Sequence, residues 1–585
     1  MTRHGTSARH LDDEPGAVMW QLRSAAPEDC ARLAEELRIH RATARVLAAR
    51  GWNTPALAAR FLNPDWEDIL DPSHLPDFNR AITRTLKAIR NRESIMIFGD
   101  YDVDGLTATA IMFTAIGISG GIVTWKIPDR LLDGYGMQEK QVEAARREGV
   151  RLIVTADSGI RCFSAVQWAR SAGIDVIITD HHLPEPRLPE AVAVVNPNRH
   201  DSVYGNPNLC GAGLAFQFAA GLFQALRMPQ RRAAALTRSL LKLAAIGTVA
   251  DVIPLVGENR AIVSLGLQGL TEVRNPGLRV LLDTIGIPPG RAATAREISF
   301  RLAPRINAAG RLEDASLILD LLRTSDLDEA RRMVATIEKI NNRRKIEQAR
   351  VLADIAGNVS RSDLDRPVLV FSRRGWHRGV LGIVAARLVD EYHKPVFVLS
   401  DDLDIAHGSG RSIPGINLVG LLESTRHYLE AFGGHEQAAG LALKSERIDV
   451  FREEICLACG ARQAARALDV DSQLHLADAL RVWPEIARLE PFGNGNPAPI
   501  FATSVRVAAP LIAVSSTTWR LNVEQDGRIY QMKYFGRGTK CGRPVPGERM
   551  DVAYRLEPDS WRSTGFAFVL EAWRQVNGRG MRPTA

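Results

Sequence analysis

The sequence predicts a multidomain α/β protein that ends in a small β-barrel. Apolar strand-like and helix-like segments alternate from about residue 94 to 180, which is typical of a mainly parallel sheet covered by helices. Residues 326–355 contain neither glycine nor proline and predict one long connecting helix. A second strand–helix–strand pattern follows it, and five short strands separated by turns then predict the barrel.

Length and composition agree with this fold class. A chain of 585 residues has room for about three or four domains. Its 45% apolar and 24% charged residues are ordinary for a globular protein, and its net charge of +7 suits a polyanionic partner. No apolar stretch suggests a membrane span, and the first 17 residues lack the apolar core of a secretory signal. We therefore expect a cytoplasmic protein with no membrane segment.

The expected order of segments follows from these patterns. Within the first α/β domain we expect strands at 95–98, 122–127, 151–157 and 175–180, with helices at 79–90 and 138–147. Cys456 and Cys459 have no second pair at zinc-site spacing and are expected on a helix face. The predicted segments are a disordered lead-in (1–19), a helical region (20–75), the first α/β domain (76–312), a connector helix (313–360), the second α/β domain (361–466), the barrel (467–577) and a tail (578–585).

Carboxylates follow the first predicted strand at alternate positions. Asp100, Asp102 and Asp104 come directly after residues 95–99. Carboxylates this close repel one another and are costly to bury unless a cation neutralises them. The alternative is an acidic turn that faces water.

Three further motifs favour the metal. Asp157, the run Asp180-His181-His182, and Asp251 each come after an apolar segment, so we expect four strand ends to present carboxylate or imidazole groups. Ligands meet at the carboxyl ends of parallel strands, and Asp with imidazole suits Mn²⁺ or Mg²⁺.

These motifs, GDYDVDG, TADSG, TDHH and GTVADV, resemble the four motifs of the DHH phosphoesterases. That family includes pyrophosphatases, oligoribonucleases and cyclic-dinucleotide phosphodiesterases, so the motifs alone imply a metal-dependent phosphoesterase without a substrate. Phe98 stands where some members carry a histidine, which implies that the first metal site relies on Asp100.

Two longer stretches, IPDRLLDGYGM (127–137) and FRLAPRINAAGRL (300–312), resemble the RecJ branch of this family, the single-strand-specific 5′-to-3′ DNA exonucleases. Guanidinium groups bind phosphate oxygens in bidentate fashion, so arginines are prominent among the candidates. The glycine-rich stretches 408–412 and 433–435 are expected as loops of a DHH-associated (DHHA1) domain that cradle phosphate. The candidate substrate-binding residues are Arg130, Tyr135, Arg305, Asn307, Arg311, Trp376, His377, Ser409, Arg411, Ser412 and His435.

The barrel is expected to be the OB-fold that RecJ proteins carry. Residues 478–585 hold 15 Lys and Arg against 10 Asp and Glu, which suits a nucleic-acid partner. OB-folds stack bases on aromatic side chains and follow the backbone with cations. The candidate aromatic residues are Trp519, Tyr530, Tyr534, Phe535 and Trp561, interleaved with Arg520, Arg528, Lys533 and Arg562.

By this resemblance the protein is a 5′-to-3′ exonuclease that releases nucleoside 5′-monophosphates from single-stranded DNA, using two divalent ions, Mn²⁺ or Mg²⁺. Asp157 would bridge the ions, Asp102, Asp104, His181 and Asp251 would complete their sites with help from Asp100, and His182 would contact the phosphate or the leaving oxygen. The resemblance also suggests a monomer that works with a single-strand-binding protein and a RecQ-type helicase in DNA repair and recombination. The alternatives are a phosphoesterase of short RNA or cyclic dinucleotides, and a non-catalytic replication scaffold.

Overall fold

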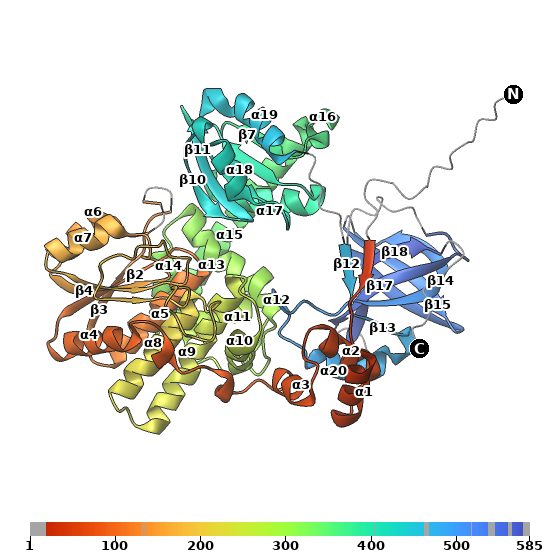
Figure 1. The fold of residues 1–585 in the computed structure, drawn as a ribbon, viewed down its shortest axis with the longest axis horizontal. Helices are drawn as coiled ribbons and strands as arrows, with labels where there is room; N and C mark the ends of the chain where they lie inside the picture. The colour runs from red at the N-terminus through yellow and green to blue at the C-terminus, as the bar shows by residue number, and fades with distance from the viewer. Residues whose placement is uncertain are drawn as a thin grey trace. The chain divides into compact units, whose positions relative to one another are not determined.

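The structure is a computed structural model that describes residues 19–130, 133–134, 136–402, 404–460, 467–515, 517–535, 544–559 and 564–576 (Figure 1). The chain forms two compact units. The larger unit comprises 65–464 together with 493–495, and the smaller unit comprises the chain up to 64, 465–492 and the chain from 496. Tyr135, Trp561, Arg562, most of the predicted lead-in and the predicted tail lie outside the described residues.

The first domain of the larger unit is built on a five-stranded parallel sheet with the strand order β3-β2-β4-β5-β6. The strands are β2 (Ser94–Gly99), β3 (Ile122–Lys126), β4 (Val150–Ala156), β5 (Asp175–Thr179) and β6 (Ala193–Val195). The helices are α4 (Phe78–Arg90), α5 (Val103–Ile118), α6 (Glu139–Arg147), α7 (Phe163–Ser171), α8 (Gly211–Ala225), α9 (Gln230–Ala250), α10 (Gly257–Gly269), α11 (Pro276–Thr284), α12 (Ala295–Glu297), α13 (Ala303–Leu312) and α14 (Ser316–Arg323). The predicted parallel sheet is confirmed.

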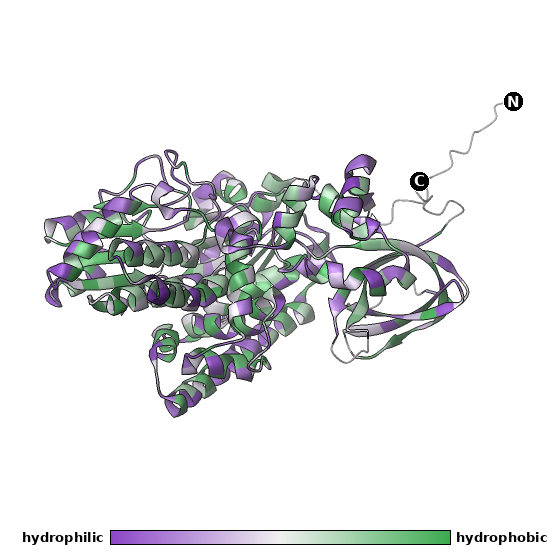
Figure 2. Ribbon diagram, turned by 90° about the horizontal axis from the view of Figure 1, so that it is seen from below, coloured by the Kyte–Doolittle hydropathy of each residue, from purple (hydrophilic) through white to green (hydrophobic). Residues whose placement is uncertain are grey.

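Strand β2 is buried on both faces, which explains its continuous apolar sequence. Ile95 and Ile97 pack in the core formed with α4, α5, α8 and α9, whereas Met96 and Phe98 pack in a second core with α6 and α7. Alternate side chains of a strand point to opposite faces, so one short strand holds both helical layers in place. Individual helices of this unit carry both hydrophobic and hydrophilic residues (Figure 2). This mixture is expected of a helix that packs only one of its sides against the core.

Helix α9 is, among the described residues, the one helix long and apolar enough to cross a membrane by length and composition. Leu240, Leu241 and Ala244 of this helix are buried in the core around the sheet, and α9 packs against α8 and α10. This is the pattern of a core helix.

The connector is a long helix, as predicted, but it begins later. The predicted range starts at 313, whereas α14 (Ser316–Arg323) packs into the first domain and α15 (Leu327–Asn358) follows it, with Asp326 as the N-cap. Val334 and Ile337 of α15 pack against the first domain, and Val351 and Ile355 pack against the second. One helix therefore contributes to the cores of both domains.

The second domain has a mixed five-stranded sheet with the order β10-β11-β9-β8-β7, in which only β7 and β8 are parallel. Two predicted loops are strands instead: 408–411 lie in β9 and 433–435 in β10. Both stretches pair with β11. The hydrogen bonds to β11 hold these glycine-rich stretches in an extended conformation, although their sequence suggests turns. The elements are α16 (Arg361–Asp365), β7 (Leu369–Arg373), α17 (Leu381–Tyr392), β8 (Val396–Ser400), β9 (Ile405–Arg411), α18 (Leu418–Ser424), β10 (Leu429–His435), β11 (Ala438–Lys444) and α19 (Ile448–Cys459).

The smaller unit contains a closed five-stranded barrel, because β14 pairs with both β15 and β17. The helices near the N-terminus share its core, and β1, which the sequence did not predict, pairs in parallel with β12. The elements are β1 (Met19–Leu22), α1 (Pro27–Glu36), α2 (Arg41–Ala49), α3 (Pro55–Leu62), β12 (Ala467–Val470), β13 (Ser472–Gln473), α20 (Ala479–Ala487), β14 (Phe501–Ala513), β15 (Thr518–Gln525), β16 (Arg528–Phe535), β17 (Arg549–Pro558) and β18 (Phe566–Gln575).

The aromatic side chains of the barrel do not all serve as a binding face. Tyr530 and Tyr534 pack against the barrel core, edge-on to Phe568 and Trp573. Phe535 is exposed. The first two tyrosines therefore stabilise the barrel, and Phe535 is the candidate among the three that is free to stack on a base.

Candidate metal centre and phosphate site

The turn between β2 and α5 places three carboxylates in a small volume. Asp100 lies in the turn, Asp102 caps α5 by accepting a hydrogen bond from the N–H of Gly105 (3.1 Å), and Asp104 lies in the first turn of the helix. Asp104 accepts hydrogen bonds from the N–H groups of Gly211 (2.7 Å) and Ala212 (2.8 Å) at the start of α8. Two helix N-termini therefore face this cluster, which favours negative charge there.

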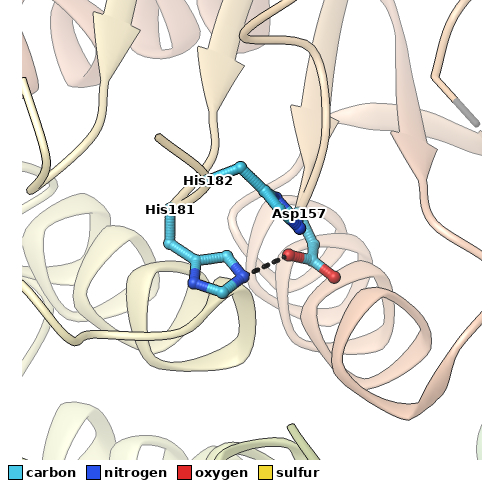
Figure 3. A group of neighbouring side chains, drawn as sticks. All are labelled: Asp157, His181 and His182. Carbon is cyan, nitrogen blue, oxygen red and sulfur yellow. Dashed lines mark ion pairs between the residues drawn. The ribbon is translucent and has the colours of Figure 1, made fainter. Parts of the chain in front are cut away.

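Asp157 and His181 extend from the next two strand ends (Figure 3). His181 Nε2 lies 3.1 Å from Asp157 Oδ1, 3.6 Å from Asp251 Oδ2 and 3.8 Å from Asp104 Oδ2. One imidazole nitrogen thus lies within 4 Å of three carboxylates. Asp251 reaches the cluster from the C-terminal end of α9, so the expectation that a strand end presents it was wrong.

Three overlapping groups of side chains could each hold a metal ion. The potential ligand atoms within each group lie within 4.8 Å of one another. Asp157 and His181 each belong to two of the groups, and of these two Asp157 is the one whose carboxylate offers two oxygen ligands. The groups are Asp100 with Asp102 and Asp157; Asp104 with His181 and Asp251; and Asp157 with His181 and His182.

Burial and mutual repulsion raise the pKa of these carboxyl groups. The pKa values of Asp100, Asp157 and Asp251 lie well above the usual range because the groups are buried and face other carboxylates. Burial and the charge of Asp102 raise the pKa of Asp104 to about 6. Burial and the neighbouring His182 lower the pKa of His181 to about 4, so this imidazole is neutral and able to bind a metal at neutral pH.

One further observation fits a cation. Asp100 Oδ1 is buried and accepts no hydrogen bond from any residue that the structure describes. Buried polar atoms are nearly always paired, and an unpaired carboxylate oxygen beside other carboxylates fits a site for a divalent ion. The oxygen and imidazole donors present are those that Mn²⁺ and Mg²⁺ accept.

His182 is held by Asp180, a residue to which sequence reasoning gave no role. Its Nδ1 lies 2.8 Å from Asp180 Oδ1, while the other oxygen of Asp180 accepts the N–H of Ile160 (2.9 Å). Burial opposes ionisation of both partners, but the hydrogen bond outweighs it: the pKa of Asp180 is lowered and the pKa of His182 is raised. The His182 ring also lies 6.2 Å from the ring of His435 in the second domain, a candidate substrate residue.

Two asparagines that follow β6 fix the backbone of both histidines. Asn196 donates to the carbonyl of His182 (2.9 Å) and Asn198 donates to the carbonyl of His181 (2.6 Å). The sequence analysis missed them because β6 itself was not predicted. The Asp180-His181-His182 run was the signal that could have identified Asp180.

Gly211 allows α8 to approach the central carboxylate. A Cβ atom at this position would lie 2.5 Å from Asp157 Cβ and 2.7 Å from Asp157 Oδ1. Any larger residue would therefore displace the carboxylate that two of the ligand groups share.

Three of the predicted arginines gather where the two domains of the larger unit meet. Arg130 lies over the ring of Tyr101 at 4.8 Å, and Arg311 donates to the carbonyl of Gly379 (3.2 Å). Burial and the charges of Arg130 and Arg411 lower the pKa of Arg311 to about 9, and burial and Arg130 lower the pKa of Arg411. Among the described residues none of these three guanidinium groups forms a salt bridge, so the cluster is a candidate site for phosphate.

Other predicted residues have partners within the protein. Arg305 forms a salt bridge with Glu338 of α15 (2.5 Å), and Asn307 accepts the N–H of Val103 at the start of α5 (3.2 Å). Both lie on α13, in which Pro304 occupies the first turn, where its missing N–H costs no hydrogen bond within the helix. Trp376 is buried and donates to Asp354 (3.1 Å), so the expectation that it contacts substrate is corrected to a packing role.

The remaining candidates lie in the second domain. His377 Nδ1 accepts the N–H of Gly379 (3.1 Å), and Ser409 Oγ lies 3.3 Å from the guanidinium of Arg411. Ser412 is buried and donates to the carbonyl of Ile416 (2.8 Å). Ser409 therefore lies beside the arginine cluster, whereas Ser412 stabilises the chain that follows β9.

Comparison with known proteins agrees with the fold and the site. Three family models match: the DHH family N-terminal domain at residues 94–248, the DHHA1 domain at 365–460 and the RecJ OB domain at 470–566. The single-stranded-DNA-specific exonuclease RecJ of Bacillus subtilis is 33% identical over 569 residues, which cover 93% of this chain and 69% of that protein. The Dickeya dadantii protein of the same name is 35% identical over 520 residues, which cover 84% of this chain and 89% of that protein.

A solved structure supports the same assignment. The crystal structure of RecJ from Thermus thermophilus in complex with Mn²⁺ matches with a TM-score of 0.82 at 28% identity, covering 96% of this chain and 80% of that one. The resemblance to the RecJ branch of the DHH family is therefore confirmed, as is the predicted fold class. The chain belongs to the RecJ family of single-stranded-DNA-specific exonucleases.

Proposed function

We propose that this protein degrades single-stranded DNA from the 5′ end and releases nucleoside 5′-monophosphates with the help of two divalent ions, Mn²⁺ or Mg²⁺. The observation that carries the proposal is the cluster of buried carboxylates around Asp157. The neutral imidazole of His181 lies among these carboxylates. The named activity of its relatives and the metal-bound Thermus thermophilus structures, one with Mn²⁺ and one with Mg²⁺, support it.

The metal-binding residues would be Asp100, Asp102, Asp104, Asp157, His181 and Asp251. When bound, two divalent ions supply an activated water and neutralise charge on the phosphate. His182, oriented and kept basic by Asp180, would donate a proton or a hydrogen bond to a phosphate or leaving oxygen. No nucleophilic side chain is required.

Phosphate recognition belongs to the arginine cluster. Arg130, Arg311 and Arg411 repel one another in a buried setting, as the lowered pKa values of Arg311 and Arg411 indicate. A bound phosphate would relieve that repulsion, and phosphate contacts position a strand without selecting its sequence. Ser409 lies beside Arg411 and the ring of His435 lies near that of His182, so both would assist.

A matched pair of variants tests the catalytic proposal. Wild-type protein, Asp157→Ala and Asp449→Ala would act on a 5′-labelled 40-nucleotide DNA strand and on its duplex, in Mn²⁺, in Mg²⁺ and in chelator. Asp449 lies on α19 with its side chain 89% exposed, so it controls for loss of a carboxylate. We expect release of labelled mononucleotide from the single strand by wild type and Asp449→Ala only, and none in chelator.

A dinucleotide substrate and a DNA-binding titration, added to this experiment, separate the alternatives. Cleavage restricted to dinucleotides would indicate a phosphoesterase of short oligonucleotides. DNA binding without cleavage in either metal would indicate a scaffold, and either result would overturn the exonuclease proposal.

Partners and assembly form part of the same proposal. We propose that the protein acts in the cytoplasm as a monomer alongside a single-strand-binding protein and a RecQ-type helicase, in DNA repair and recombination. Light scattering during size-exclusion chromatography would test the monomer, and co-purification with each partner would test the assembly.

A further inference from the structure

The residue after Asp251 has an unusual backbone conformation. Val252 has φ = 59°, in the left-handed region that β-branched residues rarely occupy. Val252 is 65% exposed, so packing of its side chain does not impose the conformation. Val252 directly follows Asp251, the C-cap residue of α9, so the left-handed residue is the immediate neighbour of a candidate metal ligand.

A short segment far along the chain holds this turn. Asn494 Nδ2 donates to the carbonyl of Val252 (2.8 Å), and the carbonyl of Asn494 accepts the N–H of Leu255 (2.8 Å). Leu255 is buried in the core, so the second hydrogen bond has a fixed anchor. The two bonds span the turn from both ends.

Glycines on both sides of Asn494 permit this approach. A Cβ at Gly493 would lie 2.8 Å from Leu255 Cδ1, and a Cβ at Gly495 would lie 3.0 Å from Pro254 Cβ. Gly495 also has φ = 70°. We call residues Gly493–Gly495 the tongue.

The tongue belongs with the larger unit, whereas the chain on both sides of it belongs to the smaller unit. Its base is fixed there by Asn496, which is buried, donates to the carbonyls of Leu489 and Pro491 (2.9 Å each) and accepts from Arg50 (3.0 Å). Asn494 is the residue of the tongue whose side chain contacts the turn after Asp251.

We propose that Asn494 is a positioning residue for the metal site: it holds Val252 in the left-handed conformation and thereby keeps the Asp251 carboxylate directed at His181. Asp251 Oδ2 lies 3.6 Å from His181 Nε2, and a relaxed turn would move it away. The inference rests on the proposed function only in that Asp251 is taken as a metal ligand.

Three variants test the proposal. Asn494→Asp keeps the size of the side chain but replaces the donor with an oxygen that repels the carbonyl of Val252. Val252→Gly accepts φ near 59° without strain, so it should make the turn independent of residue 494. The third variant combines both changes. Asn358→Asp is the control, because Asn358 is an exposed asparagine that donates to the carbonyl of Asp354 in its own helix.

Mn²⁺ binding by the whole protein is measured by calorimetry, with exonuclease rate against Mn²⁺ concentration beside it. We expect Asn494→Asp to weaken Mn²⁺ binding by about 10- to 100-fold, the usual effect of losing a group that orients a ligand. The Val252→Gly variant and the double variant should bind as the wild type does. Unchanged binding in Asn494→Asp, or failure of Val252→Gly to restore it, would overturn the proposal.

The calorimetry is independent of DNA cleavage. A wild type that binds Mn²⁺ but does not degrade DNA would overturn the proposed function while the comparison among variants still decides the role of Asn494. A loss of folding in Asn494→Asp would show in thermal unfolding, and Val252→Gly would then have to restore both folding and Mn²⁺ binding for the proposal to stand.

Discussion

Asp180 orients the imidazole of His182, whereas the other aspartates of the site are candidate metal ligands. Asp180 accepts from His182 and from the backbone N–H of Ile160, so both of its oxygens are engaged. Three of the carboxylates with raised pKa lie around His181 instead. The pKa of Asp180 is lowered whereas the pKa values of Asp104, Asp157 and Asp251 are raised, and this difference separates two kinds of aspartate that look alike in the motifs.

Asp180→Asn should lower kcat by about 10- to 100-fold while Mn²⁺ binding stays near the wild-type value. Asp180 raises the pKa of His182, so the imidazolium form persists to higher pH in the wild type. If that form assists the reaction, activity falls as pH rises through this pKa, and the variant should lose activity at a lower pH. Rate profiles between pH 6 and 9 would check this, and an unshifted profile would contradict the role of His182.

Arg411 and Arg305 are both candidates by sequence, but their surroundings differ. Arg411→Gln should raise KM for single-stranded DNA and reduce the slope of log affinity against log salt by about 0.7, the value for one phosphate contact on a single strand. Arg305→Gln should leave that slope unchanged, because Arg305 is paired with Glu338. Binding titrations at several salt concentrations distinguish them, and equal slopes would show that the arginine cluster does not contact phosphate.

The sequence predicted helices and strands correctly wherever the spacing of apolar residues followed a single pattern. The five buried residues of β2 and the long α15 followed directly from apolar runs and helical spacing. Strand assignment failed at 408–411 and 433–435, where glycines that suggest turns are extended by pairing with β11. It also failed at β1, since the partner strand β12 lies at the other end of the sequence.

Gly211→Ala tests the contact between helix α8 and the site. The new methyl group would overlap Asp157, so we expect Mn²⁺ affinity and activity to fall by at least about 10-fold, as for other changes that shift a ligand. Gly357→Ala in α15 has open space around it and should stabilise the helix by about 1 kcal/mol without altering Mn²⁺ binding. Calorimetric titration of both variants is the measurement. Normal Mn²⁺ binding by Gly211→Ala would mean that Asp157 can move without loss.

Across the whole protein, the raised carboxyl pKa values predict that metal binding is linked to proton release. The raised pKa values of Asp100, Asp157 and Asp251 mean that protons compete with a metal ion for these carboxylates, and Asp104, with a pKa of about 6, becomes partly protonated as the pH falls to 6. Mn²⁺ affinity should therefore weaken as pH falls from 8 to 6. Calorimetry in two buffers of different ionisation enthalpy would detect the released protons, and equal heats in both buffers would contradict this expectation.

By itself, the sequence determined the chemistry of the site, the fold class and the family. Carboxylates and imidazoles that follow apolar segments are local features, and their spacing is legible without coordinates. Tertiary structure decided which residues serve the site and which support it. Arg305 pairs with Glu338, Trp376 and Tyr530 turn inward, Asp180 orients His182, and Asn494 reaches the turn after Asp251. Each of these outcomes depends on packing or pairing between elements, which local sequence patterns do not encode.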